Sequence, residues 1–235
     1  MPVGVLLMSV MSCSCGAVAM HWQRLRLQLV PDYVCLSDGT AIMKQAEIFP
    51  RALPDGLTYR EEFLSSEEEQ QLLAQIRELP LTEARYQQFT ARRRTVNYGS
   101  SYDFTHLQAL PAPPLPDFLT PLRTRVAEWV GVRPEDFVQA LIAEYRPGTP
   151  LGWHRDVPDY EIVTGVSLAG AARLRFRPYP WTAQKKADVF ALEVAPRSAY
   201  ILRDDARWKW QHHVPPTKVL RYSITFRTAR STSFT

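Results

Sequence analysis

The sequence predicts a mainly β protein of the α+β class, a sandwich or barrel of short strands supported by two helices from the N-terminal half. Two observations carry this prediction. After Pro134, seven short runs of β-strand composition follow one another, separated by glycine, proline or charged clusters, with no helical stretch between them. Before Pro134, two segments place apolar residues at helical spacing, and such stripes must cover another element, most simply the back of a sheet.

The composition is that of an ordinary globular protein, with 46% hydrophobic and 22% charged residues in a chain of 235. A chain of this length can bury a core without covalent cross-links. The only cysteines are Cys13, Cys15 and Cys35, which make no disulfide framework and favour a reducing compartment. We therefore expect a cytoplasmic protein, and a monomer.

The N-terminal residues 1–56 are expected to be a partly disordered extension ahead of a domain spanning 57–230. Their first twenty residues are apolar, but no Lys or Arg precedes the apolar run, and Ser and Gly interrupt it. The run is too short and broken for a bilayer span, so no membrane partner is expected. A flexible start, or a true beginning at Met20 or Met43, is the preferred interpretation.

The first helix is predicted after a short strand at residues 57–60. Ser65 with Glu68, or Ser66 with Glu69, can form a capping box. The run then places four apolar residues at helical spacing before Pro80 stops it: Leu72, Leu73, Ile76 and Leu79. The second helix is predicted over 118–130 and closes at Gly131.

Between these helices, residues 84–104 mix aromatic side chains with three consecutive arginines, Arg92, Arg93 and Arg94. This segment has two interpretations of equal weight. It is either an exposed basic strand or a substrate lid in which Tyr98 or Tyr102 stacks on a base.

The strands predicted after the second helix are 137–145, 162–168, 172–177, 189–194, 198–202, 208–214 and 219–227. The last has an apolar face, which must pack on the core or the helices: Leu220, Tyr222, Ile224 and Phe226. Its other face carries Arg221 and Arg227, six residues and about 20 Å apart, with two hydroxyl residues between them. Guanidinium groups in this arrangement suit a dicarboxylate, although such a face is also often simply hydrated.

A tight turn at residues 146–148 leads into a segment that presents His154 and Asp156. Side chains two residues apart on an extended strand point the same way, so one imidazole and one carboxylate aim at one point. Two histidines and one carboxylate form the facial triad of iron(II) oxygenases, which leaves positions open for substrate and oxygen. The missing ligand must come from another strand, and the adjacent His212 and His213 point to opposite faces. Alternation alone does not choose between them.

These motifs together resemble the AlkB-like iron(II)/2-oxoglutarate dioxygenases over about residues 57–230. The segments that carry the resemblance are E-Y-R-P-G-T-P-L-G-W-H-R-D at 144–156, G-V-S-L at 165–168 and R-Y-S-I-T-F-R at 221–227. The resemblance implies a double-stranded β-helix (jelly roll) with supporting N-terminal helices, and a need for Fe(II), 2-oxoglutarate and O2. In the family's W-x-H-x-x-P segment the first histidine is the ligand, so the implied iron ligands are His154, Asp156 and His212.

The resemblance also implies that Tyr145 and Arg221 bind the distal carboxylate of 2-oxoglutarate, with Arg227 near its other end. Two positions depart from the family pattern. Ala143 stands where many members have an asparagine close to the cosubstrate. Pro158 stands where repair members often have an acid that contacts the base, and Asp159 beside it is the substitute candidate.

The reaction implied couples decarboxylation of 2-oxoglutarate to hydroxylation of a substrate C–H bond, and a hydroxylated N-methyl group is lost as formaldehyde. Of the 28 basic residues, 13 lie between Arg173 and Arg230, against only 4 of the 24 acidic residues. This bias favours single-stranded or flipped methylated nucleic acid as the partner, with substrate contacts from Arg92–Arg94, Tyr98, Tyr102 and Asp159. The alternatives are a hydroxylase or demethylase of protein or small molecules, favoured by Pro158, and a non-catalytic jelly-roll binding protein.

Overall fold

The computed structural model describes residues 33–35, 41–43, 53–86, 89–103, 106, 108–182 and 189–230. The chain divides into two compact units, residues 1–51 and 52–235. In the first unit, β1 (Tyr33–Cys35) pairs antiparallel with β2 (Ala41–Met43). The second unit contains the whole of the proposed domain, 57–230. Within the expected extension 1–56, only residues 33–35, 41–43 and 53–56 are described, and the disorder expected for the rest lies outside the described residues.

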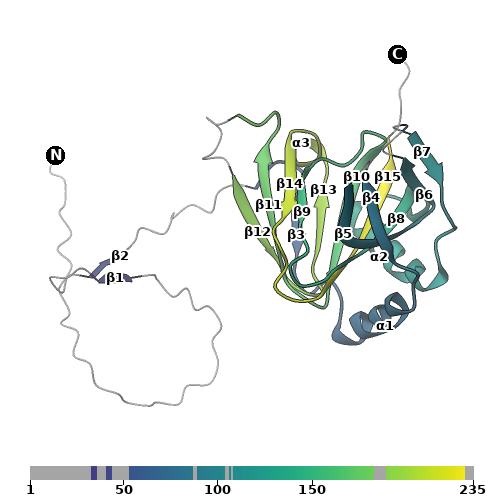
Figure 1. The fold of residues 1–235 in the computed structure, drawn as a ribbon, viewed down its shortest axis with the longest axis horizontal. Coiled ribbons are helices and arrows are strands. Elements are labelled where there is room, and N and C mark those ends of the chain that lie inside the picture. The colour runs from purple at the N-terminus through teal and green to yellow at the C-terminus, as the bar shows by residue number, and fades with distance from the viewer. Residues whose placement is uncertain are drawn as a thin grey trace. The chain divides into compact units, whose positions relative to one another are not determined.

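Two antiparallel sheets form the body of the second unit (Figure 1). The larger has the order β3 (Leu57–Arg60), β13 (Ala199–Leu202), β10 (Tyr160–Leu168), β15 (Arg221–Ala229), β8 (Phe137–Tyr145), β5 (Phe89–Tyr98) and β4 (Thr82–Tyr86). The smaller has the order β12 (Phe190–Val194), β11 (Ala172–Pro178), β14 (Trp210–Val214) and β9 (Leu151–His154). A separate hairpin joins β6 (Ser100–Asp103) to β7 (Gln108–Pro111). The mainly β double-stranded β-helix implied by the sequence is confirmed.

The two predicted helices are present, although the first ends at Arg77, before Leu79, and the second begins at Thr120 and not at 118. The first, α1 (Ser66–Arg77), is capped by Ser65, whose hydroxyl accepts from the Glu68 N–H at 3.2 Å while Glu68 accepts from the Ser65 N–H at 2.8 Å. The structure therefore selects one of the two possible capping boxes. The second, α2 (Thr120–Val130), follows η1 (Asp117–Leu119) and ends at Gly131, whose φ of 82° is the left-handed conformation that glycine adopts without strain.

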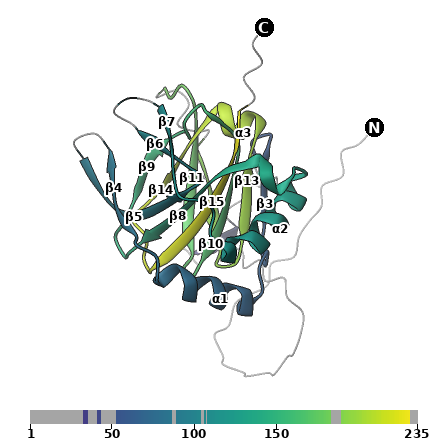
Figure 2. The same cartoon turned by 90° about the vertical axis from the view of Figure 1, so that its right-hand side faces the viewer.

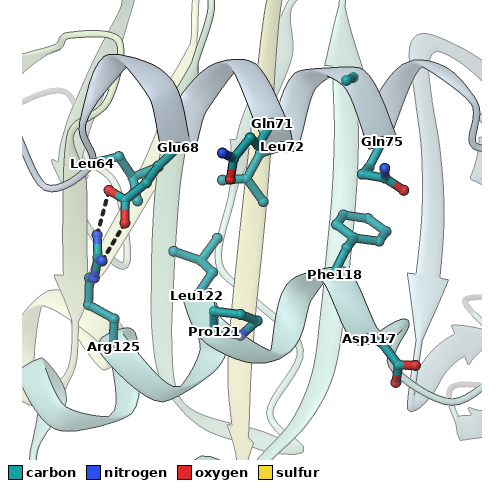
Figure 3. Close-up of a pocket in the computed structure, with 11 residues that line it drawn as sticks. Leu64, Glu68, Gln71, Leu72, Gln75, Asp117, Phe118, Pro121, Leu122 and Arg125 are labelled. Carbon is teal, nitrogen blue, oxygen red and sulfur yellow. Dashed lines mark hydrogen bonds and ion pairs between the residues drawn. The ribbon is translucent and has the colours of Figure 1, made fainter.

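Both helices cover the outer face of the larger sheet, where they bury the main hydrophobic core (Figure 2). Helix residues in this core include Leu72, Leu73, Ile76, Leu122, Val126 and Val130, and sheet residues include Ile142, Val166, Tyr222, Ile224 and Phe226. An ion pair between Glu68 and Arg125 joins the two helices beside a groove of about 850 Å³ (Figure 3). This groove lies on the helix-covered face and contains none of the predicted metal ligands.

Strand β15 has the two predicted faces, except that Leu220, expected on the apolar face, precedes the strand and is 38% exposed. Tyr222, Ile224 and Phe226 belong to the core beneath the helices. Arg221 and Arg227 lie on the opposite face and line a cavity between the two sheets. The larger sheet therefore has one face that is covered by helices and another that faces the smaller sheet and carries polar groups.

One prediction about the second half of the chain was wrong. No helical stretch was expected between the strands, but a short helix, α3 (Asp204–Trp208), lies between β13 and β14, so that β14 begins at Trp210 and not at 208. A short 3-10 turn, η2 (Pro134–Asp136), precedes β8. The helix is held by Arg207, which is 2% exposed and donates to the carbonyls of Val157 and Tyr160 at 2.7 and 2.8 Å. These partners are about fifty residues away in the chain, so local composition does not reveal them. None of the helices in the described residues combines the length and apolar character needed to cross a bilayer.

Candidate metal centre and cosubstrate cavity

The three predicted iron ligands meet between the two sheets. His212 on β14 is paired directly with His154 at the end of β9, so both imidazoles project from the same side of the smaller sheet. The ligand atoms of these two histidines and Asp156 all lie within 4.8 Å of one another. His213 lies on the other face of β14, where it stacks on Trp153 with the ring centroids 4.9 Å apart. The structure thus gives the same choice between the paired histidines as the family resemblance.

Hydrogen bonds orient His154 and Asp156 toward this common point. The Nδ1 of His154 donates to the Gly152 carbonyl at 2.8 Å, because a carbonyl can only accept, and this leaves Nε2 for a metal. Asp156 Oδ1 accepts from Arg227 Nε at 2.7 Å and from its terminal nitrogen at 2.6 Å. Asp156 Oδ2 is buried without a hydrogen-bond partner and lies 3.6 Å from His212 Nε2. A buried oxygen left open beside two imidazoles is what a metal ligand requires.

The electrostatics favour the protonation states that bind a metal. Burial lowers the pKa of His212 to about 3 and also lowers the pKa of His154, so both rings are neutral at physiological pH. Burial opposes ionisation of Asp156, but the charge of Arg227, helped by that of Arg207, holds the pKa of this carboxyl well below its usual range. Two neutral imidazoles and one carboxylate are the donor set that Fe(II) oxygenases use, so these residues fit that ion.

The cavity beside the metal ligands contains the residues implied for 2-oxoglutarate. Tyr145 on β8 and Arg221 on β15 are register partners, and the guanidinium carbon of Arg221 lies 5.0 Å from the Tyr145 ring centroid. Arg221 is 3% exposed and its Nε donates to Ser167 Oγ at 3.0 Å. Within the part of the chain that the structure describes, Arg221 has no carboxylate partner. A buried guanidinium without a counter-charge beside a phenol fits one end of a dicarboxylate.

Arg227 lies in the same cavity but has a different visible role. Its guanidinium clamps Asp156, and its remaining terminal nitrogen donates to Gln139 Oε1 at 2.7 Å. Arg227 therefore positions a metal ligand, a contact that the sequence reasoning missed. Strand alternation had placed Arg227 correctly in the cavity, but Asp156 is 71 residues away in the chain.

The three consecutive arginines predicted to bind substrate do not share one surface. Arg93 faces the cavity between the sheets, and Arg92 is exposed on the opposite side of β5. Arg94, also on that opposite side, is paired with Glu144 at 3.2 Å and donates to the Leu81 carbonyl at 2.7 Å. Alternation along β5 separates them, since it is an inner strand of the larger sheet.

The other substrate candidates are also separated. Tyr98 is 8% exposed and belongs to the core beneath the helices. Tyr102 on β6 is half-buried, and partial burial together with the nearby charge of Asp159 raises its pKa. Tyr102 and Asp159 are thus the pair of these residues that the structure brings together.

Two further residues of the site were not anticipated. Ser167 holds Arg221, and Arg207 fixes the backbone that follows Asp156 through its bonds to Val157 and Tyr160. Ser167 lies within the G-V-S-L segment that contributed to the resemblance, so that segment contained a signal. No sequence signal marked Arg207, because a single arginine near other basic residues is indistinguishable from a surface charge.

The fold and site define a non-haem iron oxygenase with a seat for a dicarboxylate cosubstrate. In agreement, a family model described as the 2OG-Fe(II) oxygenase superfamily matches residues 56–227. An Arabidopsis thaliana protein named alkylated DNA repair protein ALKBH8 homolog is 30% identical over 207 residues, which are 77% of this chain and 57% of that protein. The mouse tRNA (carboxymethyluridine(34)-5-O)-methyltransferase ALKBH8 is 27% identical over 178 residues, 71% of this chain and 25% of that protein.

Two further proteins are similar to this chain. Uncharacterized protein L905 of Acanthamoeba polyphaga mimivirus is 36% identical over 105 residues, 38% of this chain and 47% of that protein. The structure of OsALKBH1 superimposes with a TM-score of 0.60 over 76% of this chain and all of that one, at 14% identity, and shows the same fold. The chain spans roughly half or less of the length of these curated relatives. It belongs to the 2OG-Fe(II) oxygenase superfamily, as an AlkB-like dioxygenase that uses Fe(II), 2-oxoglutarate and O2.

Proposed function

We propose that this protein oxidatively demethylates alkylated bases in single-stranded nucleic acid. The names of two relatives support a nucleic-acid substrate, since one is called an alkylated DNA repair protein homolog and the other a tRNA methyltransferase. The observation that carries the proposal is a surface of alternating arginines and aromatic rings on the outer face of the smaller sheet.

At the centre of this surface lie stacked side chains from β9, β11 and β14 and from the residues that follow β11. The Arg177 guanidinium lies 4.5 Å from the Trp153 ring and 5.2 Å from the Trp181 ring. Arg175, two residues earlier on β11, lies 5.6 Å from the same Trp153 ring. His213 stacks on Trp153 from β14. Aromatic and guanidinium planes of this kind accept nucleic-acid bases of any sequence.

The charge of this surface favours a polyanion over a peptide or a small molecule. Arg173 on the same strand is paired with Glu193 at 3.2 Å. Arg175 and Arg177, by contrast, have no carboxylate partner among the residues described here, and neither has Arg155, which stacks on Tyr179 at 3.7 Å. Unpaired guanidinium groups next to flat rings match the phosphates and bases of a single strand.

In the proposed reaction, each group of residues has a separate task. His154, Asp156 and His212 would hold Fe(II), which when bound activates oxygen with electrons from 2-oxoglutarate. Tyr145 and Arg221 orient the cosubstrate, and the buried walls of the cavity exclude water. Tyr102 and Asp159 are the proposed contacts to the base that enters the site.

The direct test is release of formaldehyde, dependent on Fe(II) and 2-oxoglutarate, from methylated single-stranded DNA, single-stranded RNA, methylated peptides and small amines. We expect release from oligonucleotides. Release from peptides or amines alone would refute the nucleic-acid proposal and support the alternative substrate class. If 2-oxoglutarate were not converted to succinate with any of these substrates, the proposal that the protein is an active oxygenase would be contradicted.

A pair of variants links the surface to this activity. Arg175→Ala/Arg177→Ala should weaken binding of an unmethylated single strand about tenfold and reduce the slope of log K against log salt by about 1.4, because two phosphate contacts are lost. Turnover of 2-oxoglutarate without substrate should not change. Arg173→Ala is the matched control, since Arg173 is on the same strand but already paired with Glu193. Equal binding by the double variant and the control would show that the nucleic acid lies elsewhere.

A further inference from the structure

Arg93 is a charged side chain inside the cosubstrate cavity that the iron chemistry does not use. It lies on β5 and lines the cavity together with Tyr145 and Arg221. Its terminal nitrogen donates to the Tyr145 hydroxyl at 3.4 Å, and its guanidinium carbon is 5.9 Å from the Tyr145 ring centroid. Its Nε is buried and has no hydrogen-bond partner. A desolvated guanidinium with an open donor is unfavourable unless an anion or a strong acceptor completes it.

Among the described residues, a second cation contacts the same phenol as Arg93, and no carboxylate is paired with Arg93. Arg93 and Arg221 flank the same phenol from β5 and β15, the two strands on either side of β8. In the described part of the chain, neither arginine is paired with a carboxylate. Burial alone would raise the pKa of Tyr145, yet the charges of Arg93 and Arg221 lower it overall. Two cations thus lie against one phenol and would repel each other unless an anion bound between them.

The residue two positions before Tyr145 on the same strand does not provide a hydrogen-bond partner for these guanidinium groups. Ala143, two residues before Tyr145 on β8, also lines the cavity and its methyl group makes no hydrogen bond. The polar wall on this side is therefore supplied from the neighbouring strand by Arg93. A carboxylate offers two oxygens, which is enough for one contact to each guanidinium.

We propose that Arg93 is a second guanidinium for the distal carboxylate of 2-oxoglutarate, acting with Arg221 and the Tyr145 hydroxyl, and that it does not bind nucleic acid. This inference depends on the cosubstrate that the family shows and is independent of the proposed nucleic-acid function. It also assigns Arg93 a role different from that of its immediate neighbour Arg92, which is exposed on the other side of the strand.

The test is calorimetric binding of 2-oxoglutarate to the full chain loaded with Mn(II) under anaerobic conditions, so that no turnover is needed. Arg93→Met should weaken binding roughly 10- to 100-fold, the loss of a charge-assisted hydrogen bond in a desolvated site. Arg93→Lys, which keeps the charge but not the fork, should recover part of the affinity. Arg92→Met is the matched control and should bind as the unsubstituted protein does. Equal affinities for Arg93→Met and Arg92→Met would overturn the proposal.

A second comparison distinguishes direct binding from positioning of Tyr145. In a Tyr145→Phe background, Arg93→Met should still weaken 2-oxoglutarate binding, because the carboxylate contact does not pass through the phenol. With 2-oxopentanoate, a keto acid of the same length without the distal carboxylate, Arg93→Met should have no effect. If the loss vanishes in the Tyr145→Phe background, or is the same for both keto acids, Arg93 is not a carboxylate ligand. Thermal unfolding of each variant identifies any that fail to fold, and the lysine variant then carries the comparison.

Discussion

Replacing Arg227 by methionine should destabilise the protein and its metal site, whereas the same replacement of Arg221 should leave both intact. The two arginines lie on one face of β15 and both are largely buried. They differ in what they contact. Arg227 is bound to the ligand Asp156, and Arg221 donates to the uncharged Ser167.

The magnitude for Arg227 follows from the group that its loss leaves behind. Asp156 is 4% exposed, and its Oδ1 accepts a hydrogen bond from Arg227 Nε and lies 2.6 Å from a terminal nitrogen of the same guanidinium. Removing one partner of a buried ion pair leaves an uncompensated charge and costs about 3–5 kcal/mol. For a domain of this size that corresponds to a fall in melting temperature of roughly 6–20 °C. Loss of a residue that holds a metal ligand typically lowers metal affinity about 10- to 100-fold.

Replacing Arg221 should affect the stability of the protein in a different direction. Since the described residues provide no counter-charge, replacing this guanidinium by an apolar side chain of similar length removes a desolvated cation, and stability of the cosubstrate-free protein should stay level or rise. Binding of 2-oxoglutarate should fall by about 2–5 kcal/mol, roughly 30-fold or more.

The assay is thermal unfolding of the metal-free variants, followed by titration with Mn(II) and then with 2-oxoglutarate. Arg227→Met should unfold at a lower temperature and bind Mn(II) more weakly. Arg221→Met should differ from the unsubstituted protein only in its weaker binding of 2-oxoglutarate. Equal melting temperatures and Mn(II) affinities for the two variants would show that the clamp on Asp156 contributes nothing. An unchanged 2-oxoglutarate affinity in Arg221→Met would place the dicarboxylate elsewhere.

Two further predictions concern the metal ligands and the helix pair. His212→Ala should abolish Mn(II) binding, whereas His213→Ala should retain most of it, because only the first ring faces the other ligands; titration of both variants checks this, and the reverse order would refute the assignment. Arg125→Ala should lower the free energy of unfolding at pH 7 by about 0.3–1 kcal/mol, the usual range for an exposed ion pair. Arg125, together with the hydrogen bond from the Ser65 N–H, lowers the pKa of Glu68 from 4.5 to about 2 in the folded state, so the contribution of the ion pair is present above pH 4.5 and disappears as the pH falls toward 2. Denaturant unfolding of Arg125→Ala and of the unsubstituted protein, at pH 7 and near pH 2, measures this contribution. A difference in unfolding free energy that persists at the acid pH would contradict the ion-pair explanation.

The elements whose signals lie within a few residues could be read from the sequence. The capping box at Ser65 and the left-handed residue at Gly131 marked the two helices, because caps satisfy backbone groups of their own helix. Alternation along β15 separated the core face from the cavity face, because side chains on a strand point to opposite sides. The same rule brought His154 and Asp156 to one point.

The partners of these side chains depended on the tertiary structure. Arg227 clamps Asp156 across 71 residues, and Arg93 meets Tyr145 across 52. Such pairs follow from strand order and register, which join distant segments and have no periodicity in the sequence. For this reason three consecutive arginines, which the sequence analysis treated as one group, lie in three different environments in the structure.

The sequence by itself determined the kind of chemistry, since the ligand types and their spacing required only local geometry and agreed with a family pattern. The tertiary structure decided which charges are buried, which are paired and which are left without a partner. A guanidinium is the same group in every sequence context, and its energy is set by desolvation and by the charges around it. Those surroundings are formed only when the two sheets close over the cavity.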